Sequence, residues 1–129
     1  MNNTLKIAAI AAFSTLLAAC TTQSPTVSEI DPSLSLSDRA YSIKTQQACE
    51  AESGTWRKVG RLQAFACVLP TADAGKACTD SSECQVGCIV EEHVEPGTKV
   101  VGQCMSSTHR FGCNTMVTNG VVEGTLCID

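Results

Sequence analysis

Eight cysteines between residue 49 and the C-terminus constrain the fold of this chain more than any other feature. The chain has 129 residues but only one Trp, one Tyr and three Phe, so a core of large apolar side chains would be small. Small domains that cannot build a sufficient core are commonly held together by disulfides. The even number of cysteines predicts four bridges. The residues are Cys49, Cys67, Cys78, Cys84, Cys88, Cys104, Cys113 and Cys127.

The N-terminal segment has the pattern of an export signal. Lys6 precedes a run over residues 7–19 that is dominated by Ala, Ile and Leu. A charged start before such a run is typical of a secretory signal peptide. The run is shorter than the roughly 20 residues that a membrane-spanning helix needs. We therefore expect the rest of the chain in an oxidising compartment, where disulfides form.

The end of this run, "LLAAC", closes at Cys20 and resembles the lipobox of bacterial lipoproteins. The resemblance implies that residues 1–19 are a cleaved signal peptide and that Cys20 is acylated, so that acyl chains hold the protein on a membrane. Leu17 favours this interpretation, because an ordinary cleavage site has a small residue at that position. The alternative is a soluble secreted protein in which Cys20 merely ends the apolar run.

The residue after Cys20 bears on location. In enterobacterial lipoproteins an Asp there favours retention in the inner membrane. This chain has Thr21 instead, which by resemblance implies a lipid anchor in the outer membrane and a domain that faces the periplasm. Removing residues 1–19 removes one lysine and no carboxylate, so the net charge of −4 becomes −5. This balance argues against nucleic acid as a partner, which requires clustered cations.

Residues 20–38 are predicted to be the lipidated cysteine and a flexible tether. Residues 21–38 contain ten Ser, Thr or Pro among eighteen positions and no aromatic residue. Such a composition buries too little apolar surface to offset the entropy of ordering. As a flexible coil the tether would hold the domain about 25 Å from the bilayer. Alternatively, the alternation over residues 33–37 forms an edge strand on the domain.

Residues 39–129 are predicted to form one small disulfide-rich domain of the α+β class, with one N-terminal helix followed by short antiparallel strands and hairpins. The helix is expected over residues 39–52, with Asp38 as its N-cap and Gly54 as its stop. Strands are expected at 56–59, 62–69, 90–94 and 99–103, and a hairpin at 115–122. Pro96-Gly97 favours a type II turn and Asn119-Gly120 a tight hairpin turn.

The pairing of the cysteines is only partly suggested by their order. We pair Cys49 with Cys67 and Cys113 with Cys127, because each pair joins sequence neighbours within one helix-strand or hairpin unit. The other four would form the remaining two bridges in an order that the sequence leaves open. The segment "GKACTDSSECQVGC" over residues 75–88 predicts a loop knotted by bridges, and it resembles the loops of small extracellular disulfide-rich modules.

Cys84 and Cys88, with His93 five residues further on, are the one constellation that suggests a copper site or a thiol-redox site. The absence of any Cys-x-x-Cys spacing argues against such chemistry. His93 and His109 are the only bases for a serine nucleophile, and neither lies in a recognisable motif. The acidic pairs, such as Asp73 with Asp80, suit turn caps or solvated surface. We therefore predict no enzyme, no bound metal and no cofactor.

Two charged segments remain. Arg57, Lys58 and Arg61 surround the first predicted hairpin, and Glu91, Glu92 and Glu95 surround the second. They either form two faces of opposite sign or face each other. A basic hairpin tip would suit anionic envelope polymers or lipid headgroups.

The leading functional hypothesis is a lipid-anchored, non-catalytic binding or structural module of the cell envelope. Its partner would be an envelope protein or a glycan. A second hypothesis is a small inhibitor of a hydrolase that acts on the envelope, with residues 89–103 as the inhibitory loop. The third is the copper or redox site described above.

Overall fold

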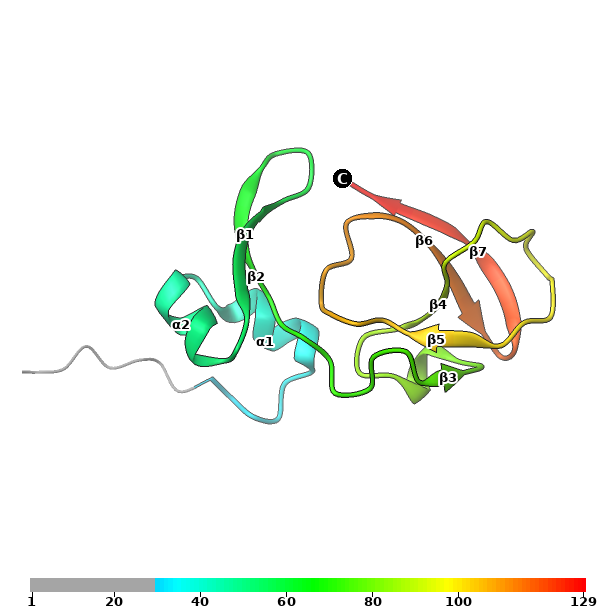
Figure 1. Ribbon diagram of the computed structural model, residues 1–129, viewed down its shortest axis with the longest axis horizontal. Coiled ribbons are helices and arrows are strands. Elements are labelled where there is room, and N and C mark those ends of the chain that lie inside the picture. Colours follow the sequence, from blue (N-terminus) through cyan, green and yellow to red (C-terminus); the bar gives the residue numbers. More distant parts are fainter. Residues whose placement is uncertain (1–29) are drawn as a thin grey trace, which may run out of the picture.

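The computed structural model describes residues 30–129. A helical and hairpin half comes first, and a five-stranded sheet follows it (Figure 1). We call residues 30–70 the N-terminal half and residues 71–129 the C-terminal half. The elements of the N-terminal half are α1 (Leu36–Ser42), α2 (Gln46–Ala51), β1 (Thr55–Val59) and β2 (Ala64–Val68).

The C-terminal half is a mostly β region with very short strands at one side. Its sheet has the order β3-β5-β4-β6-β7, and all neighbouring strands are antiparallel. The elements are β3 (Ala77–Cys78), the 3-10 helix η1 (Ser81–Glu83), β4 (Cys88–Val90), β5 (Gly102–Cys104), β6 (Gly112–Thr118) and β7 (Val121–Ile128).

Two short helices replace the single helix predicted over residues 39–52. α1 is capped by Ser35, whose Oγ accepts from the Asp38 N–H at 3.2 Å and donates to the Asp38 carboxylate at 2.6 Å. The chain becomes extended at Ile43, whose side chain is buried, and Thr45 then caps α2. The single-helix prediction is wrong because Thr45 supplies a second helix start, and Asp38 lies in the first turn rather than at the N-cap.

The predicted tether overlaps the folded region. Ile30 and Leu36 pack against the N-terminal core, so the chain belongs to the domain from residue 30 onward. Residues 33–37 form the approach to α1 and its first turn rather than an edge strand. The signal peptide predicted at residues 1–19, Cys20 and the first part of the predicted tether lie outside the described residues.

The two halves have different cores. In the N-terminal half the buried cluster consists of Ala40, Ile43, Cys49, Cys67 and Leu69. In the C-terminal half the cluster consists of Cys78, Cys88, Cys104 and Val117. Aliphatic side chains thus form most of the first core, and sulfur forms most of the second.

A short seam joins the halves. The Leu69 N–H donates to Thr108 Oγ1 at 3.0 Å, and the Thr108 N–H donates back to the Leu69 carbonyl at 2.9 Å. The two halves are therefore joined by this reciprocal pair of hydrogen bonds between Leu69 and Thr108 as well as by the chain connection.

The disulfide-rich α+β class with many antiparallel strands is confirmed, and the hairpins at β1–β2 and β6–β7 are present. The strands predicted at 90–94 and 99–103 are much shorter. The Pro96-Gly97 turn forms, with Gly97 at φ +85°. However, the Gly97 N–H donates to the Val122 carbonyl at 2.8 Å. The loop therefore pairs with the start of β7, and its two arms pair with each other only at their ends, where β4 meets β5.

Candidate functional site

The tip of the β1–β2 hairpin presents both apolar and basic side chains to solvent. Leu62 in the turn is 92% exposed and Phe65 on β2 is 57% exposed. Arg57, Lys58 and Arg61 are exposed as well. We call these five residues the hairpin patch. Lys58 shares a face of the hairpin with Phe65, its register partner, and Arg57 lies on the opposite face. Exposed apolar side chains next to cations are typical of surfaces that meet an anionic partner.

A series of ring contacts connects the hairpin patch to the N-terminal core. Lys58 and Phe65 are opposite each other in the strand register, and Lys58 Nζ lies 5.6 Å from the Phe65 ring centroid. The Phe65 ring stacks beside Trp56 at a centroid distance of 6.0 Å. Trp56 in turn packs against the N-terminal core. The exposed ring is therefore held in place by a partly buried one.

The base of the hairpin is rigid because a disulfide closes it. Cys49 on α2 is bonded to Cys67 on β2. A Cβ at Gly54 would lie 2.7 Å from both sulfurs and 2.8 Å from the Leu69 side chain. The backbone thus passes directly over the bridge, which fixes the direction in which the hairpin leaves the helices. Figure 1 shows the hairpin extending beyond α1 and α2.

One basic residue of the hairpin patch has a weak partner. Arg61 lies 3.7 Å from the Asp129 carboxylate, and both side chains are largely exposed. An ion pair that is open to solvent contributes little to stability. Arg61 can therefore exchange Asp129 for another anion at small cost.

The acidic segment lies elsewhere on the molecule. Glu91, Glu92 and Glu95 are exposed in the loop between β4 and β5. Figure 1 places this loop at the far side of the C-terminal half from the hairpin tip, so the two charged segments do not face each other. The loop borders an open groove of about 590 Å³ formed with β3, β4 and β5.

All eight predicted cysteines form disulfides in the structure. The predicted pairs Cys49–Cys67 and Cys113–Cys127 are confirmed. The two pairs that the sequence left open are Cys78–Cys88 and Cys84–Cys104.

The structure does not bring together Cys84, Cys88 and His93, the residues of the alternative copper or thiol-redox site. Cys84 and Cys88 belong to different bridges, so neither supplies a free thiolate. Cys88 is fully buried within the sheet, whereas His93 lies in the exposed loop with its Nδ1 atom 3.4 Å from Thr125 Oγ1. The three residues lie apart because Cys88 at the start of β4 is buried and the chain leaves the sheet before His93.

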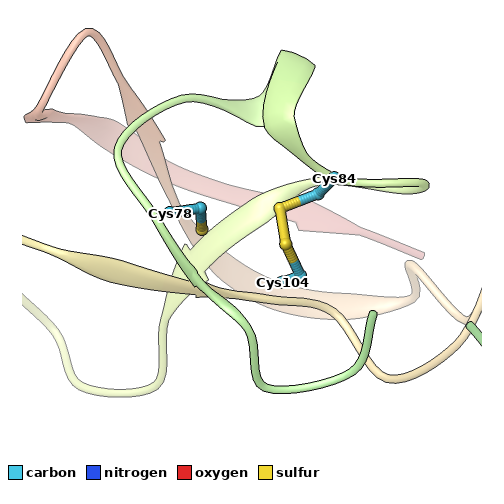
Figure 2. Close-up of side chains that lie close together, drawn as sticks. All are labelled: Cys78, Cys84 and Cys104. Atoms are coloured by element: carbon cyan, nitrogen blue, oxygen red, sulfur yellow. A yellow bond between two sulfur atoms is a disulfide. The ribbon is translucent and has the colours of Figure 1, made fainter. Parts of the chain in front are cut away.

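Sequence reasoning missed a sulfur cluster in the C-terminal half. The Sγ atoms of Cys78, Cys84 and Cys104 lie within 4.8 Å of one another (Figure 2). They belong to two neighbouring disulfides, and the fourth sulfur is that of Cys88. We call these four residues the sulfur cluster. The dense cysteine spacing over residues 78–88 was the available signal, but the contribution of Cys104 depends on the strand order.

Asp73 and Asp80, considered as a catalytic pair, both accept hydrogen bonds from backbone N–H groups, and Asp80 is the N-cap of η1. Asp73 accepts from the Gln85 N–H at 2.7 Å. Asp80 accepts from the Ser82 N–H at 2.9 Å and from the Asn119 N–H at 3.0 Å. Hydrogen bonds from the Ser82 side chain, the Ser82 backbone and the Asn119 backbone lower the pKa of Asp80 to about 2. A carboxylate held ionised in this way is a poor proton donor near neutral pH.

His109 is partly buried beside Phe111, at a ring-centroid distance of 5.8 Å. Its backbone N–H donates to Ser107 Oγ at 3.3 Å. The Ser107 hydroxyl thus contacts the backbone of His109 and not its imidazole ring, so this hydrogen bond does not pair a serine nucleophile with a histidine base.

Cys20, the predicted lipidation site, lies outside the described residues. Within residues 30–129, no helix is long and apolar enough to cross a membrane. No protein-family model, no curated protein and no solved structure matches this chain.

Proposed function

We propose that the chain is a lipid-anchored, non-catalytic binding module of the cell envelope. Cys20 would carry the acyl chains, in the outer membrane with the domain facing the periplasm. The lipobox resemblance of "LLAAC" supports the anchor. Stable attachment needs more than one acyl chain, which two or three chains on Cys20 would provide.

The single observation that carries the binding role is the hairpin patch. Leu62 and Phe65 are large, apolar and exposed, and three cations accompany them. Exposing large apolar side chains to water costs free energy. Leu62 and Phe65 do not belong to the buried cluster, which lies at the other end of the hairpin, so the fold does not need them at these positions. The partner is therefore a phosphate-bearing or carboxylate-bearing ligand of the envelope, bound by the cations and covered by Leu62 and Phe65.

The test uses the mature chain from residue 20 with Cys20→Ala, exported behind a different signal so that no acyl chain binds membranes. One arm measures cosedimentation with vesicles of phosphatidylglycerol and phosphatidylcholine against phosphatidylcholine alone. The other arm uses purified peptidoglycan. We expect binding in one arm that weakens as salt is raised.

A matched pair of variants makes the test specific. Arg57→Gln/Lys58→Gln/Arg61→Gln removes the three cations of the hairpin patch. Lys44→Gln/Lys76→Gln/Lys99→Gln makes the same charge change at exposed positions elsewhere. Each surface cation contributes about 1 kcal/mol near an anionic membrane, so the first variant should bind about a hundredfold more weakly. Equal affinity of the two variants, or no binding in either arm, would contradict the proposal.

The loop over residues 91–101 favours a second candidate, the hydrolase inhibitor. It runs between Cys88 and Cys104, which are held by separate bridges. Three backbone hydrogen bonds of 2.8 to 3.0 Å fasten it to Gly120 and Val122. A loop fixed in this way loses little entropy when it enters an active site. Unchanged rates across a panel of proteases and lysozymes, measured with excess domain, would eliminate this candidate.

A further inference from the structure

The sulfur cluster has an arrangement that a purely structural role does not require. In the sheet, β5 lies between β3 and β4, so the Cys78–Cys88 bridge passes over the middle strand. It crosses at Gly102, the register partner of Cys78, where a Cβ would lie 2.9 Å from Cys88 Sγ. The Cys84–Cys104 bridge lies beside it, with the sulfurs of Cys84 and Cys104 both within 4.8 Å of Cys78 Sγ (Figure 2).

The four cysteines differ in access. Cys84 is partly exposed at the end of η1. Cys78 and Cys104 are 2% exposed, and Cys88 is fully buried. Because thiol-disulfide exchange begins at the sulfur that an external thiolate can reach, an incoming thiolate attacks Cys84 rather than the other three. Cys104 is then the leaving group.

The geometry points to an internal thiol-disulfide exchange: a dithiol that reduces the exposed bridge at Cys84 causes the buried bridge to move, so that Cys78 becomes bonded to Cys104 and Cys88 is released. This chemistry goes beyond the proposed binding function and does not depend on the hairpin patch. The reaction partner is a dithiol, either a small molecule or an envelope protein.

The steps balance as ordinary exchange reactions. The first thiolate of the dithiol attacks Cys84 Sγ, forms a mixed disulfide and releases Cys104 as a thiolate. Cys104 Sγ attacks Cys78 Sγ, so the Cys78–Cys104 bond forms and Cys88 leaves as a thiolate that takes up a proton. The second thiol of the dithiol then attacks the first sulfur of the same dithiol, which is bonded to Cys84, and releases Cys84 as a thiolate that takes up a proton. One dithiol is oxidised, and one protein disulfide becomes the thiols of Cys84 and Cys88.

The strand arrangement favours this product. Cys78 is opposite Gly102 on the neighbouring strand, so Cys104, two residues further along, lies on the same face of the sheet. β3 is only two residues long and lies at the sheet edge. The segment just before it is hydrogen-bonded to Cys104, from the Cys104 N–H to the Lys76 carbonyl at 2.8 Å and from the Gly75 N–H to the Cys104 carbonyl at 2.9 Å. Cys78 therefore starts close to Cys104, and its approach has to distort these two bonds. The new bridge would join adjacent strands and would no longer cross over β5. Its formation would also free β4 from β3.

The experiment treats the oxidised mature chain with a limiting amount of dithiothreitol, quenches with acid, alkylates with N-ethylmaleimide and maps the peptides by mass spectrometry. The molecules scored are those that gained two alkyl groups in the sulfur cluster. We expect the groups on Cys84 and Cys88, together with a Cys78–Cys104 crosslinked peptide. Alkylation of Cys84 and Cys104 with Cys78–Cys88 intact would overturn the proposal, and so would reduction confined to Cys113 and Cys127.

A variant checks the order of events. Cys78→Ala/Cys88→Ala removes the receiving bridge and keeps Cys84–Cys104. The same treatment should then place both alkyl groups on Cys84 and Cys104. Because the wild-type result alone decides the proposal, poor folding of this variant would not remove the test. Circular dichroism of the wild type during the same treatment separates exchange from simple denaturation. Exchange labels the buried Cys88 while the spectrum still shows a folded protein.

Discussion

The two halves of the molecule are stabilised by different means. The N-terminal half buries aliphatic side chains from two capped helices against a hairpin and uses one disulfide at its centre. The C-terminal half has three strands of only two or three residues, and three disulfides lie within it. Two of these bridges, Cys78–Cys88 and Cys84–Cys104, lie where the strand pairing is shortest, and the third, Cys113–Cys127, joins the two longest strands.

The difference also separates the chemistry of the halves. In the N-terminal half the sulfurs of Cys49 and Cys67 are enclosed by Leu69 and by the backbone at Gly54. In the C-terminal half two bridges touch each other and one of them reaches the surface at Cys84. The first arrangement isolates a bridge, and the second allows bridges to react with each other.

Removal of a bridge from the sulfur cluster should have the largest effect. Loss of a native disulfide from a small secreted domain typically costs about 2–5 kcal/mol. Cys78→Ala/Cys88→Ala also leaves buried space, whereas both cysteines of Cys113→Ala/Cys127→Ala are exposed. We expect the first variant to lose more unfolding free energy, measured by urea denaturation. Equal losses would show that the buried sulfurs do not form a core.

Alanine at the two glycines that face a bridge compares the halves directly. Overpacking costs about 1–3 kcal/mol. We expect Gly102→Ala to lose more unfolding free energy than Gly54→Ala. Its Cβ would lie 2.7 Å from the Ile89 carbonyl oxygen, which is backbone, whereas Gly54 faces only side chains within that range. A reversed order in urea denaturation would place the tighter core in the N-terminal half.

Thr108→Val tests whether the halves unfold together. It leaves the Leu69 N–H without its partner, which costs about 1–3 kcal/mol for a buried donor. We expect separate transitions for Trp56 fluorescence, which reports on the N-terminal half, and far-ultraviolet circular dichroism. Thr118→Val, whose hydroxyl meets Glu123 on the exposed surface, should leave the transitions coincident. If Thr108→Val also retains one transition, the seam does not couple the halves.

Acid should weaken the C-terminal half through Asp80, with the smallest effect of the four. Its folded pKa of about 2 lies below the ordinary value of 3.8. The stabilisation is therefore present above the unfolded pKa and is lost as the pH falls through about 2. Asp80→Asn should lower the denaturation midpoint near neutral pH, and the difference from wild type should shrink as the pH falls. A constant difference would show that ionisation is not involved, and Glu92→Gln provides an exposed control.

Local signals in the sequence predicted much of this fold. Asn119 and Gly120 both have positive φ in the β6–β7 turn, as the dipeptide favours. The pairs Cys49–Cys67 and Cys113–Cys127 were predictable because each joins elements adjacent in the chain. In each case the partner is close in sequence.

The features that could not be predicted depend on distant partners. The Cys78–Cys88 and Cys84–Cys104 pairs require β5 to lie between β3 and β4, and no local pattern encodes that order. The charges of the hairpin patch were visible in the sequence, but the exposure of Leu62 and Phe65 was not. An alternating strand would equally allow either side chain to face a core.

The most direct test of a lipid-anchored domain held by four disulfides is the intact mass of the protein from its native membrane fraction, alkylated with and without prior reduction. We expect a mature chain that begins at Cys20 and carries acyl mass, with eight alkyl groups added only after reduction. A chain without acyl mass, or cysteines that are alkylated before reduction, would contradict a lipid-anchored domain held by four disulfides.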